Sequence, residues 1–303
     1  MQKSSFGSKE GVEMSKFSIE NVKFPKERNL GVILAGGPGS RLLPLTKTIN
    51  KHLLPVGPYP MIYHPLIDLI KLGVKDIFIV TGHEHMGGFT EQLGDGSKLG
   101  VNITYVVQQQ PNGIGGALGL VIDRVARFMH VASLAASGVA LSGSRLIVVL
   151  GDNIFNHEAF VSKVRNTMLK NNTVDVFIKR VKDNNRFGVP SFSSYNDLLK
   201  VDEKPEIPVT DYAMVGFYMF KMNLVLGMMK DFMFGGDYRK SERGEYEITD
   251  ILNWLAMKSE TVHWIRVMCN KLNSTFWTDA GTHASLHKAN EYMENYRFWA
   301  NLD

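Results

Sequence analysis

The sequence is poor in cysteine. Its 303 residues include one, Cys269, so neither a disulfide framework nor a cysteine-rich metal site can form within the chain. A lone thiol is compatible with a reducing cytoplasm, which is where we expect this protein to reside. A chain of this length can bury a full hydrophobic core and needs no such cross-links to be stable.

Long hydrophobic runs are missing as well. The most apolar stretches, such as residues 146–150, have the length of a strand and fall far short of the roughly 18 residues of a membrane-spanning helix. The first 29 residues are rich in Lys, Ser and Glu and lack the apolar centre of a signal peptide. We therefore predict a loosely ordered leader over residues 1–29 and no association with a membrane.

The chain also lacks a large excess of charge of one sign. Lys and Arg number 34 and Asp and Glu number 30, which leaves a formal net charge of +4. This balance is too mild to indicate binding of nucleic acid. It suits small anionic ligands, so a phosphate-binding motif is the feature to look for.

Short apolar segments alternate with amphipathic ones from Leu30 onward. This alternation is typical of α/β proteins, and continuous apolar strands indicate a parallel sheet that is covered on both faces. We predict a three-layer αβα sandwich with a mostly parallel, Rossmann-like central sheet, built as a single domain over residues 30–303. Strands are predicted at 30–34, 76–80, 101–107, 145–150, 174–181 and 213–220, and helices at 61–72, 115–129, 247–258 and 282–298.

A glycine-rich turn, Gly36-Gly37-Pro38-Gly39-Ser40-Arg41, follows the first predicted strand. Glycines let a backbone approach a ligand closely and direct its N–H groups toward an anion, although a plain tight turn needs them too. The turn is no dinucleotide fingerprint, because Leu42 stands where the third glycine belongs, and no segment supplies a Walker A loop. Arg41 and, ten positions later, Lys51 add two cations that suit a triphosphate.

Two polar side chains follow other predicted strands. Asp152 comes one glycine after residues 146–150, at the edge of the sheet where α/β proteins bind ligands. A carboxylate at this position could bind Mg²⁺, or it could accept backbone hydrogen bonds within a turn. Gln108 carries both a donor and an acceptor, which match the edge of a pyrimidine base, although a polar strand end before a helix explains it without a ligand.

These motifs occur together and in one order over roughly residues 30–290. They comprise residues 34–46, 51–56, 60–66, 93–97, 151–155, 203–205, 243–250 and 277–283. In this combination the chain resembles the sugar-1-phosphate nucleotidylyltransferases, above all the glucose-1-phosphate thymidylyltransferases among them. The resemblance implies transfer of a nucleotidyl group from a nucleoside triphosphate to a sugar 1-phosphate, with Mg²⁺ as cofactor and a homo-oligomer as the assembly.

The resemblance also implies a role for individual residues. Residues 30–155 would bind the nucleotide and residues 156–303 the sugar phosphate. The catalytic set would be Arg41, Lys51, Asp152 and Lys204, and the Mg²⁺ ligands would be Asp152 and Asp250, whereas Asp279 is predicted to form a turn. The nucleotide would contact Leu34, Gly36, Gly37, Gly39, Ser40, Arg41, Gln108, Pro111, Gly113 and Asp152. The sugar phosphate would contact Asn153, Gly188, Glu203, Lys204 and Met214.

Departures from the family pattern leave the substrates open. Thymidylyltransferases usually carry L-A-Q-A where this chain has Ile114-Gly115-Gly116-Ala117, and Gly116 predicts a base pocket that is either roomier or differently hydrogen-bonded. Ser191, Met214 and Val215 depart from the family near the sugar. We predict dTTP first and UTP next, with glucose 1-phosphate as acceptor. The alternative is a UTP-, CTP- or GTP-dependent transferase that acts on a different phosphorylated acceptor. A catalytically inactive regulatory subunit is the rival class, but such a protein is expected to lose one of the catalytic cations or aspartates.

Overall fold

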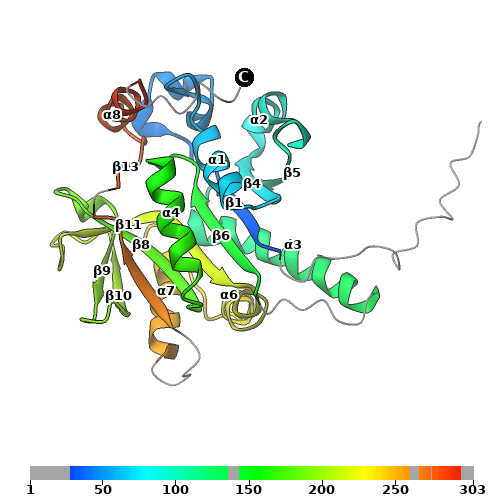
Figure 1. Ribbon diagram of the computed structural model, residues 1–303, viewed down its shortest axis with the longest axis vertical. Coiled ribbons are helices and arrows are strands. Elements are labelled where there is room, and N and C mark those ends of the chain that lie inside the picture. Colours follow the sequence, from blue (N-terminus) through cyan, green and yellow to red (C-terminus); the bar gives the residue numbers. More distant parts are fainter. Residues whose placement is uncertain (1–27, 136–142, 260–265, 274, 295–303) are drawn as a thin grey trace, which may run out of the picture.

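The computed structural model describes residues 28–135, 143–259, 266–273 and 275–294, with the side chains of 128–135 left aside. Nearly all of the leader predicted at 1–29, and the end of the helix predicted at 282–298, lie outside the described residues. Figure 1 shows a central sheet with helices packed on both of its faces. Within the described part of the chain, no helix combines the length and the hydropathy needed to cross a bilayer.

Seven strands form the main sheet. They are β1 (Leu30–Leu34), β4 (Asp76–Gly82), β5 (Asn102–Gln108), β6 (Arg145–Leu150), β8 (Val174–Arg180), β11 (Tyr212–Lys221) and β12 (Val267–Lys271). Their order across the sheet is β12-β8-β11-β6-β1-β4-β5. β1 pairs in parallel with β4 and β6, β4 with β5, and β12 with β8, whereas β11 runs antiparallel to β6 and β8. The sheet is therefore mostly parallel, with one reversed strand.

Alternating side chains of β1 show why the sheet is buried on both faces. Val32 and Leu34 belong to one hydrophobic core, under α3 (Gly113–Ala135) and α7 (Ile248–Ser259). Ile33 belongs to the other core, under α1 (Tyr63–Lys71), α2 (Met86–Leu93) and α4 (His157–Met168). Successive residues of a strand point to opposite faces, so an apolar run needs a helix layer on each side. The predicted three-layer αβα sandwich is confirmed.

Shorter elements surround this sandwich. The paired strands are β2 (Pro55–Val56) with β3 (Tyr59–Pro60), β7 (Ile154–Phe155) with β13 (Trp277–Thr278), and β9 (Gly188–Phe192) with β10 (Leu198–Glu203). The remaining helices are α5 (Met222–Leu224), a π-helical turn at Val225–Met229, α6 (Lys230–Phe234) and α8 (His283–Glu294). The 3₁₀ turns are η3 (Ser40–Leu42), η4 (Leu45–Lys47), η5 (Lys51–Leu53), η6 (His83–His85), η7 (Ser97–Leu99) and η8 (Asn184–Arg186).

The six predicted strands all lie in the main sheet, and the four predicted helices correspond to α1, α3, α7 and α8. The sequence analysis did not identify α2, α4, β12 or the β9–β10 hairpin. Parallel pairing of β1 with β4 and β6 brings the carboxyl ends of these strands to one edge of the sheet. The loops that follow them meet at that edge, which is where open α/β sheets bind ligands.

Candidate active site

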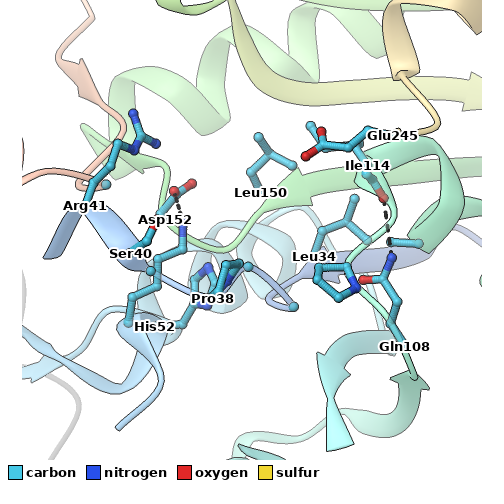
Figure 2. Close-up of a pocket in the computed structure, with 18 residues that line it drawn as sticks. Leu34, Pro38, Ser40, Arg41, His52, Gln108, Ile114, Leu150, Asp152 and Glu245 are labelled. Carbon is cyan, nitrogen blue, oxygen red and sulfur yellow. Dashed lines mark hydrogen bonds and ion pairs between the residues drawn. The ribbon is translucent and has the colours of Figure 1, made fainter. Parts of the chain in front are cut away.

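A pocket of about 310 Å³ opens at the carboxyl edge of the sheet (Figure 2). Figure 2 shows Arg41 and Asp152 at one end of it and Gln108, Ile114 and Glu245 at the other. All ten residues predicted to contact the nucleotide line this pocket, together with Lys51. The lining is Leu34, Gly36, Gly37, Pro38, Gly39, Ser40, Arg41, Lys51, His52, Gln108, Pro111, Gly113, Ile114, Ala117, Leu150, Asp152, Glu245 and Gly281.

A second pocket of about 190 Å³ adjoins the first. The two share Arg41, Ile114, Leu150 and Asp152 in their linings. All five residues predicted to contact the sugar phosphate line the second pocket. The rest of its lining is Arg186, Phe187, Gly216, Tyr218, Ile248, Thr249, Trp277 and Asp279. Each pocket draws on both of the predicted parts, 30–155 and 156–303, and that division stays a prediction.

Lys51 and Asp152 form an ion pair at the junction of the pockets. Lys51 Nζ lies 2.5 Å from Asp152 Oδ2, and each side chain is only 12% exposed. Burial acts to raise the pKa of Asp152, but the charge and hydrogen bond of Lys51 outweigh it and hold that pKa below the ordinary range. Asp152 is therefore an anion that faces both pockets, held in place by a cation from η5.

A second aspartate, Asp279, lines the second pocket together with Asp152. Its Oδ1 accepts a hydrogen bond from Arg186 Nη2 at 3.0 Å, and its side chain is largely buried. Burial and the nearby charge of Asp152 raise the pKa of Asp279, against the opposing charges of Arg186 and Arg41. Asp279 was predicted to form only a turn. The structure instead places it in the same pocket as Asp152.

Asp250, the predicted second Mg²⁺ ligand, lies elsewhere. Its side chain is exposed on α7 and lines neither pocket. The periodicity of the helix explains this, because α7 buries Ile248, Ile251 and Leu252 against the sheet. Asp250 falls outside that buried stripe. Asp250 is thus not among the residues that line a pocket with Asp152, and its role as a Mg²⁺ ligand stays a prediction.

Asp152 and Asp279 are suited to hold a divalent cation. The charge of Asp152 raises the pKa of Asp279, so a cation near both carboxylates would favour the ionised form of Asp279. Hard cations such as Mg²⁺ take carboxylate oxygens together with phosphate oxygens and water. Among the described residues, no group of three or more His, Cys, Asp or Glu side chains could hold a metal. A cation at this pair would therefore take its remaining ligands from water and from bound phosphates.

Lys204 and Glu203 lie at the end of β10, in the second pocket. Lys204 adopts φ 47°, a backbone conformation that side chains rarely take and that costs on the order of 1 kcal/mol. Glu203 Oε1 lies 3.5 Å from Lys204 Nζ and 3.2 Å from Arg243 Nη2. Burial raises the pKa of Glu203, although the charges of Lys204 and Arg243 oppose this. Strained backbone of this kind clusters at functional sites.

Two arginines were not predicted as site residues: Arg186, which lines the second pocket, and Arg243, which contacts Glu203 of that pocket. Arg186 pairs with Asp279, and Arg243 bridges Glu203 and Glu247, with 2.6 Å between its Nη2 and Glu247 Oε1. Arg243 begins the segment 243–250 that carries the family resemblance, so a search for cations inside such segments could have found it, whereas Arg186 lies outside them. Which carboxylate each arginine contacts depends on the fold.

The base end of the first pocket is packed more tightly than predicted. The carbonyl of Tyr246 lies 2.5 Å from where a Cβ of Gly113 would be, and a Cβ at Gly115 would overlap the Tyr238 hydroxyl. A Cβ at Gly116 would overlap the side-chain amide of Asn112. The expectation that Gly116 leaves a roomier pocket is wrong, because the space beside it is already filled. α3 begins at Gly113, so its N-terminus, which favours anions, opens onto the pocket.

The chain matches a family model described as nucleotidyl transferase over residues 30–296. It is similar to the glucose-1-phosphate thymidylyltransferase of Neisseria meningitidis serogroup A, with 33% identity over 90% of this chain and 85% of that protein. It is also similar to the enzyme of that name from Xanthomonas campestris pv. campestris, with 36% identity over 87% of this chain and 80% of the other.

Solved structures agree with these matches. A crystal structure from Bacillus anthracis, named as a glucose-1-phosphate thymidylyltransferase in complex with sucrose, has a TM-score of 0.71 and 38% identity, covering 89% of this chain and 97% of that one. A structure of UDP-glucose pyrophosphorylase with UDP-glucose has a TM-score of 0.70 at 19% identity, covering 89% and 100% of the two chains. At that level of identity the second likeness bears on the fold alone.

Proposed function

The chain belongs to the nucleotidyl transferase family, and from that premise we propose that it transfers the thymidylyl group of dTTP to glucose 1-phosphate and releases pyrophosphate. The names of its relatives support these substrates. The observation that carries the proposal is the junction of the two pockets at Arg41 and Asp152. A triphosphate in the first pocket and a sugar phosphate in the second would meet at these two residues.

In the proposed reaction, an oxygen of the sugar phosphate attacks the α-phosphorus of dTTP. A new P–O bond forms as the bond to the bridging oxygen breaks, and pyrophosphate takes that electron pair. The attacking oxygen is already anionic at neutral pH, because the second pKa of a phosphate monoester is about 6. The reaction therefore needs no general base or covalent intermediate, and the protein contributes positioning and charge stabilisation.

We assign the charged groups to the two substrates by the pocket that they line. The glycine-rich turn, Arg41 and Lys51 would bind the triphosphate, and Lys204 would bind the incoming phosphate. Proteins of this family generally use a divalent metal. We propose Mg²⁺, held by Asp152 and Asp279, and when bound it would neutralise charge that develops on the phosphates. Glu203 would accept hydrogen bonds from sugar hydroxyls, whereas Asn153, whose Oδ1 already accepts from Gly216 N–H and Trp277 Nε1–H, would line the sugar-phosphate pocket without a free acceptor.

A cytoplasmic location and a homo-oligomeric assembly are part of the same proposal. The buried free thiol of Cys269 is compatible with a reducing compartment. Light scattering of the purified chain, coupled to size exclusion, would measure the molar mass of the assembly. A mass equal to that of one chain would contradict the oligomer.

The proposed substrates are tested by the initial rate of pyrophosphate release over a grid of nucleoside triphosphates and sugar 1-phosphates, with Mg²⁺ present. We expect the highest kcat/KM with dTTP and glucose 1-phosphate, and the next highest with UTP. Faster turnover with GTP or ATP would contradict the pyrimidine assignment. If no pyrophosphate is released with glucose 1-phosphate but it is released with another sugar 1-phosphate, the assignment of glucose 1-phosphate as acceptor is contradicted. If no pair of substrates releases pyrophosphate, the chain is better described as a catalytically inactive regulatory subunit.

Replacing Glu203 by glutamine is expected to change the pH dependence of sugar binding. The pKa of Glu203 is raised by burial, so as the pH falls this side chain loses its charge at a higher pH than an ordinary glutamate does. Charged hydrogen bonds to sugar hydroxyls are then lost, and KM for glucose 1-phosphate rises on the acid side. Glu203→Gln cannot titrate, and it should raise that KM about tenfold at neutral pH with a flatter pH profile.

The measurement is KM for glucose 1-phosphate of the wild type and of Glu203→Gln from about pH 5 to pH 8. The ratio of the two KM values is expected to change as the pH falls and Glu203 of the wild type takes up a proton. The titration of the substrate phosphate is common to both enzymes and cancels in the ratio. KM for dTTP serves as the control, because Glu203 does not line the first pocket. A ratio that stays constant with pH would contradict the role of Glu203.

A further inference from the structure

The side chain of Asn112 occupies the space that Gly116 leaves. Asn112 lies in the turn between β5 and α3, and its backbone is fixed because its carbonyl accepts a hydrogen bond from Tyr246 N–H at 2.7 Å. A Cβ added at Gly116 would overlap the side-chain amide of Asn112. The conformation of Asn112 therefore requires a glycine at position 116.

Asn112 in turn contacts Gln108. Gln108 Nε2 donates a hydrogen bond to Asn112 Oδ1 at 2.6 Å and lies 3.4 Å from the carbonyl oxygen of Gly113. A backbone carbonyl can only accept, so the atom that faces it must be the donating nitrogen of Gln108. The atom of Asn112 that accepts the hydrogen bond from Gln108 Nε2 must then be its side-chain oxygen. These neighbours fix which way the Gln108 amide points.

The amide oxygen of Gln108 is left to face the glycine-rich turn. A Cβ at Gly36 would lie 2.8 Å from Gln108 Oε1, so this oxygen lies over the backbone of that turn, inside the first pocket. Gln108 is itself 7% exposed. Figure 2 shows its amide nitrogen directed toward the turn that leads into Ile114. A ligand in the pocket therefore meets Gln108 as a hydrogen-bond acceptor.

We propose that Asn112 is a positioning residue for base selection, which fixes Gln108 as an acceptor and so selects pyrimidines that carry a hydrogen on the ring nitrogen N3. This inference rests on the proposed function and extends it to the nucleobase. Thymine and uracil carry a hydrogen on N3, whereas N3 of cytosine is a bare acceptor. Cytosine would bring two acceptors together, and the buried oxygen of Gln108 would stay unpaired. A Gln108 that could flip its amide would lose this discrimination.

The first test is Asn112→Ala, assayed with dTTP and with CTP as nucleotide. We expect KM for dTTP to rise about tenfold, and the ratio of kcat/KM for dTTP to that for CTP to fall about tenfold. KM for glucose 1-phosphate should stay within about twofold, because Asn112 lines neither pocket and its side chain hydrogen-bonds the base-reading residue Gln108 rather than a residue of the second pocket. Asn112→Asp, which keeps an acceptor oxygen in the same place, should retain the selectivity for dTTP.

An exchange of the two positions provides the second test. Gly116→Gln should lower the selectivity for dTTP, because its side chain collides with Asn112. In the double variant Asn112→Ala with Gly116→Gln, the vacated space can take the glutamine amide, and the selectivity should return to within about threefold of the wild type. Thermal unfolding of each variant identifies any that fails to fold, and the inference is then judged on Asn112→Ala and Asn112→Asp.

Binding of dTTP and CTP by calorimetry separates this inference from the proposed function. If the wild-type chain binds neither nucleotide, the proposed function fails. If it prefers dTTP and Asn112→Ala keeps the full preference, the proposed function stands and the role of Asn112 is overturned. A parallel rise in KM for dTTP and for glucose 1-phosphate, with unchanged base selectivity, would also overturn it, because that pattern indicates a merely structural role.

Discussion

Replacing Asp152 by asparagine is expected to lower kcat for nucleotidyl transfer by about 10³-fold, which corresponds to about 4 kcal/mol of transition-state stabilisation. Asp152 lines both pockets and is the ionised partner of Lys51. Asparagine keeps the shape but removes the charge, so Lys51 is left without its counter-ion and a cation loses a ligand. The measurement is the rate of pyrophosphate release at saturating dTTP, glucose 1-phosphate and Mg²⁺.

A loss of activity in Asp152→Asn has meaning only if the variant folds. Asparagine retains the oxygen that accepts from Asn153 Nδ2, so the turn after β6 should persist. The thermal unfolding midpoint and the circular dichroism spectrum should therefore stay close to those of the wild type. A folded Asp152→Asn variant with kcat within about threefold of the wild type would contradict the assignment, because such a change is under 1 kcal/mol.

The second large effect is expected at Asp279. Asp279→Asn should lower kcat about 100-fold at ordinary Mg²⁺ and raise the Mg²⁺ concentration needed for half-maximal activity, since a carboxylate ligand is lost. Asp250→Asn is the matched variant, with the same chemical change at an exposed position on α7 that lines neither pocket. It should keep activity within about twofold, as surface substitutions usually do.

The measurement for this pair is a Mg²⁺ titration of the initial rate for the wild type and both variants. The reverse outcome, in which Asp250→Asn loses activity and its Mg²⁺ response while Asp279→Asn keeps both, would restore the assignment made from sequence. Arg186→Lys serves as a further check on Asp279. It keeps the charge that opposes the raised pKa of Asp279 but loses the planar donor group.

Most of the main sheet could be predicted because its central strands are apolar on both faces. β1 and β6 match the predicted 30–34 and 145–150, since every residue from Leu146 to Val149 is fully buried. The hairpin of β9 and β10 mixes Pro190 and Ser191 with exposed residues, so it has no continuous apolar signal. α4 did carry a sequence signal that could have predicted it. Asn156 caps this helix by accepting a hydrogen bond from Ala159 N–H, and the apolar residues Phe160 and Val164, four positions apart, share its buried face.

The candidate site was predictable where a motif lies directly beside a strand end. The glycine-rich turn follows β1 and Asp152 follows β6. Because these two strands are parallel neighbours in the sheet, the turn and Asp152 lie next to each other in the pocket. Asp279 and Asp250 could not be ranked by their motifs alone, although the periodicity of α7 already points Asp250 away from the sheet. The packing of Asn112 against Gly116 and of Tyr238 against Gly115 depends on side-chain conformation, which no spacing in the sequence reveals.

The most direct measurement of nucleotidyl transfer follows the α-phosphate of dTTP. The purified chain would be incubated with Mg²⁺, glucose 1-phosphate and dTTP that carries a radioactive label on the α-phosphorus. The proposed reaction predicts that the label appears in a sugar nucleotide, with an equal amount of unlabelled pyrophosphate, and that Asp152→Asn forms both about 10³-fold more slowly. Label recovered as thymidine monophosphate, or no label transferred by the folded wild-type chain, would contradict it.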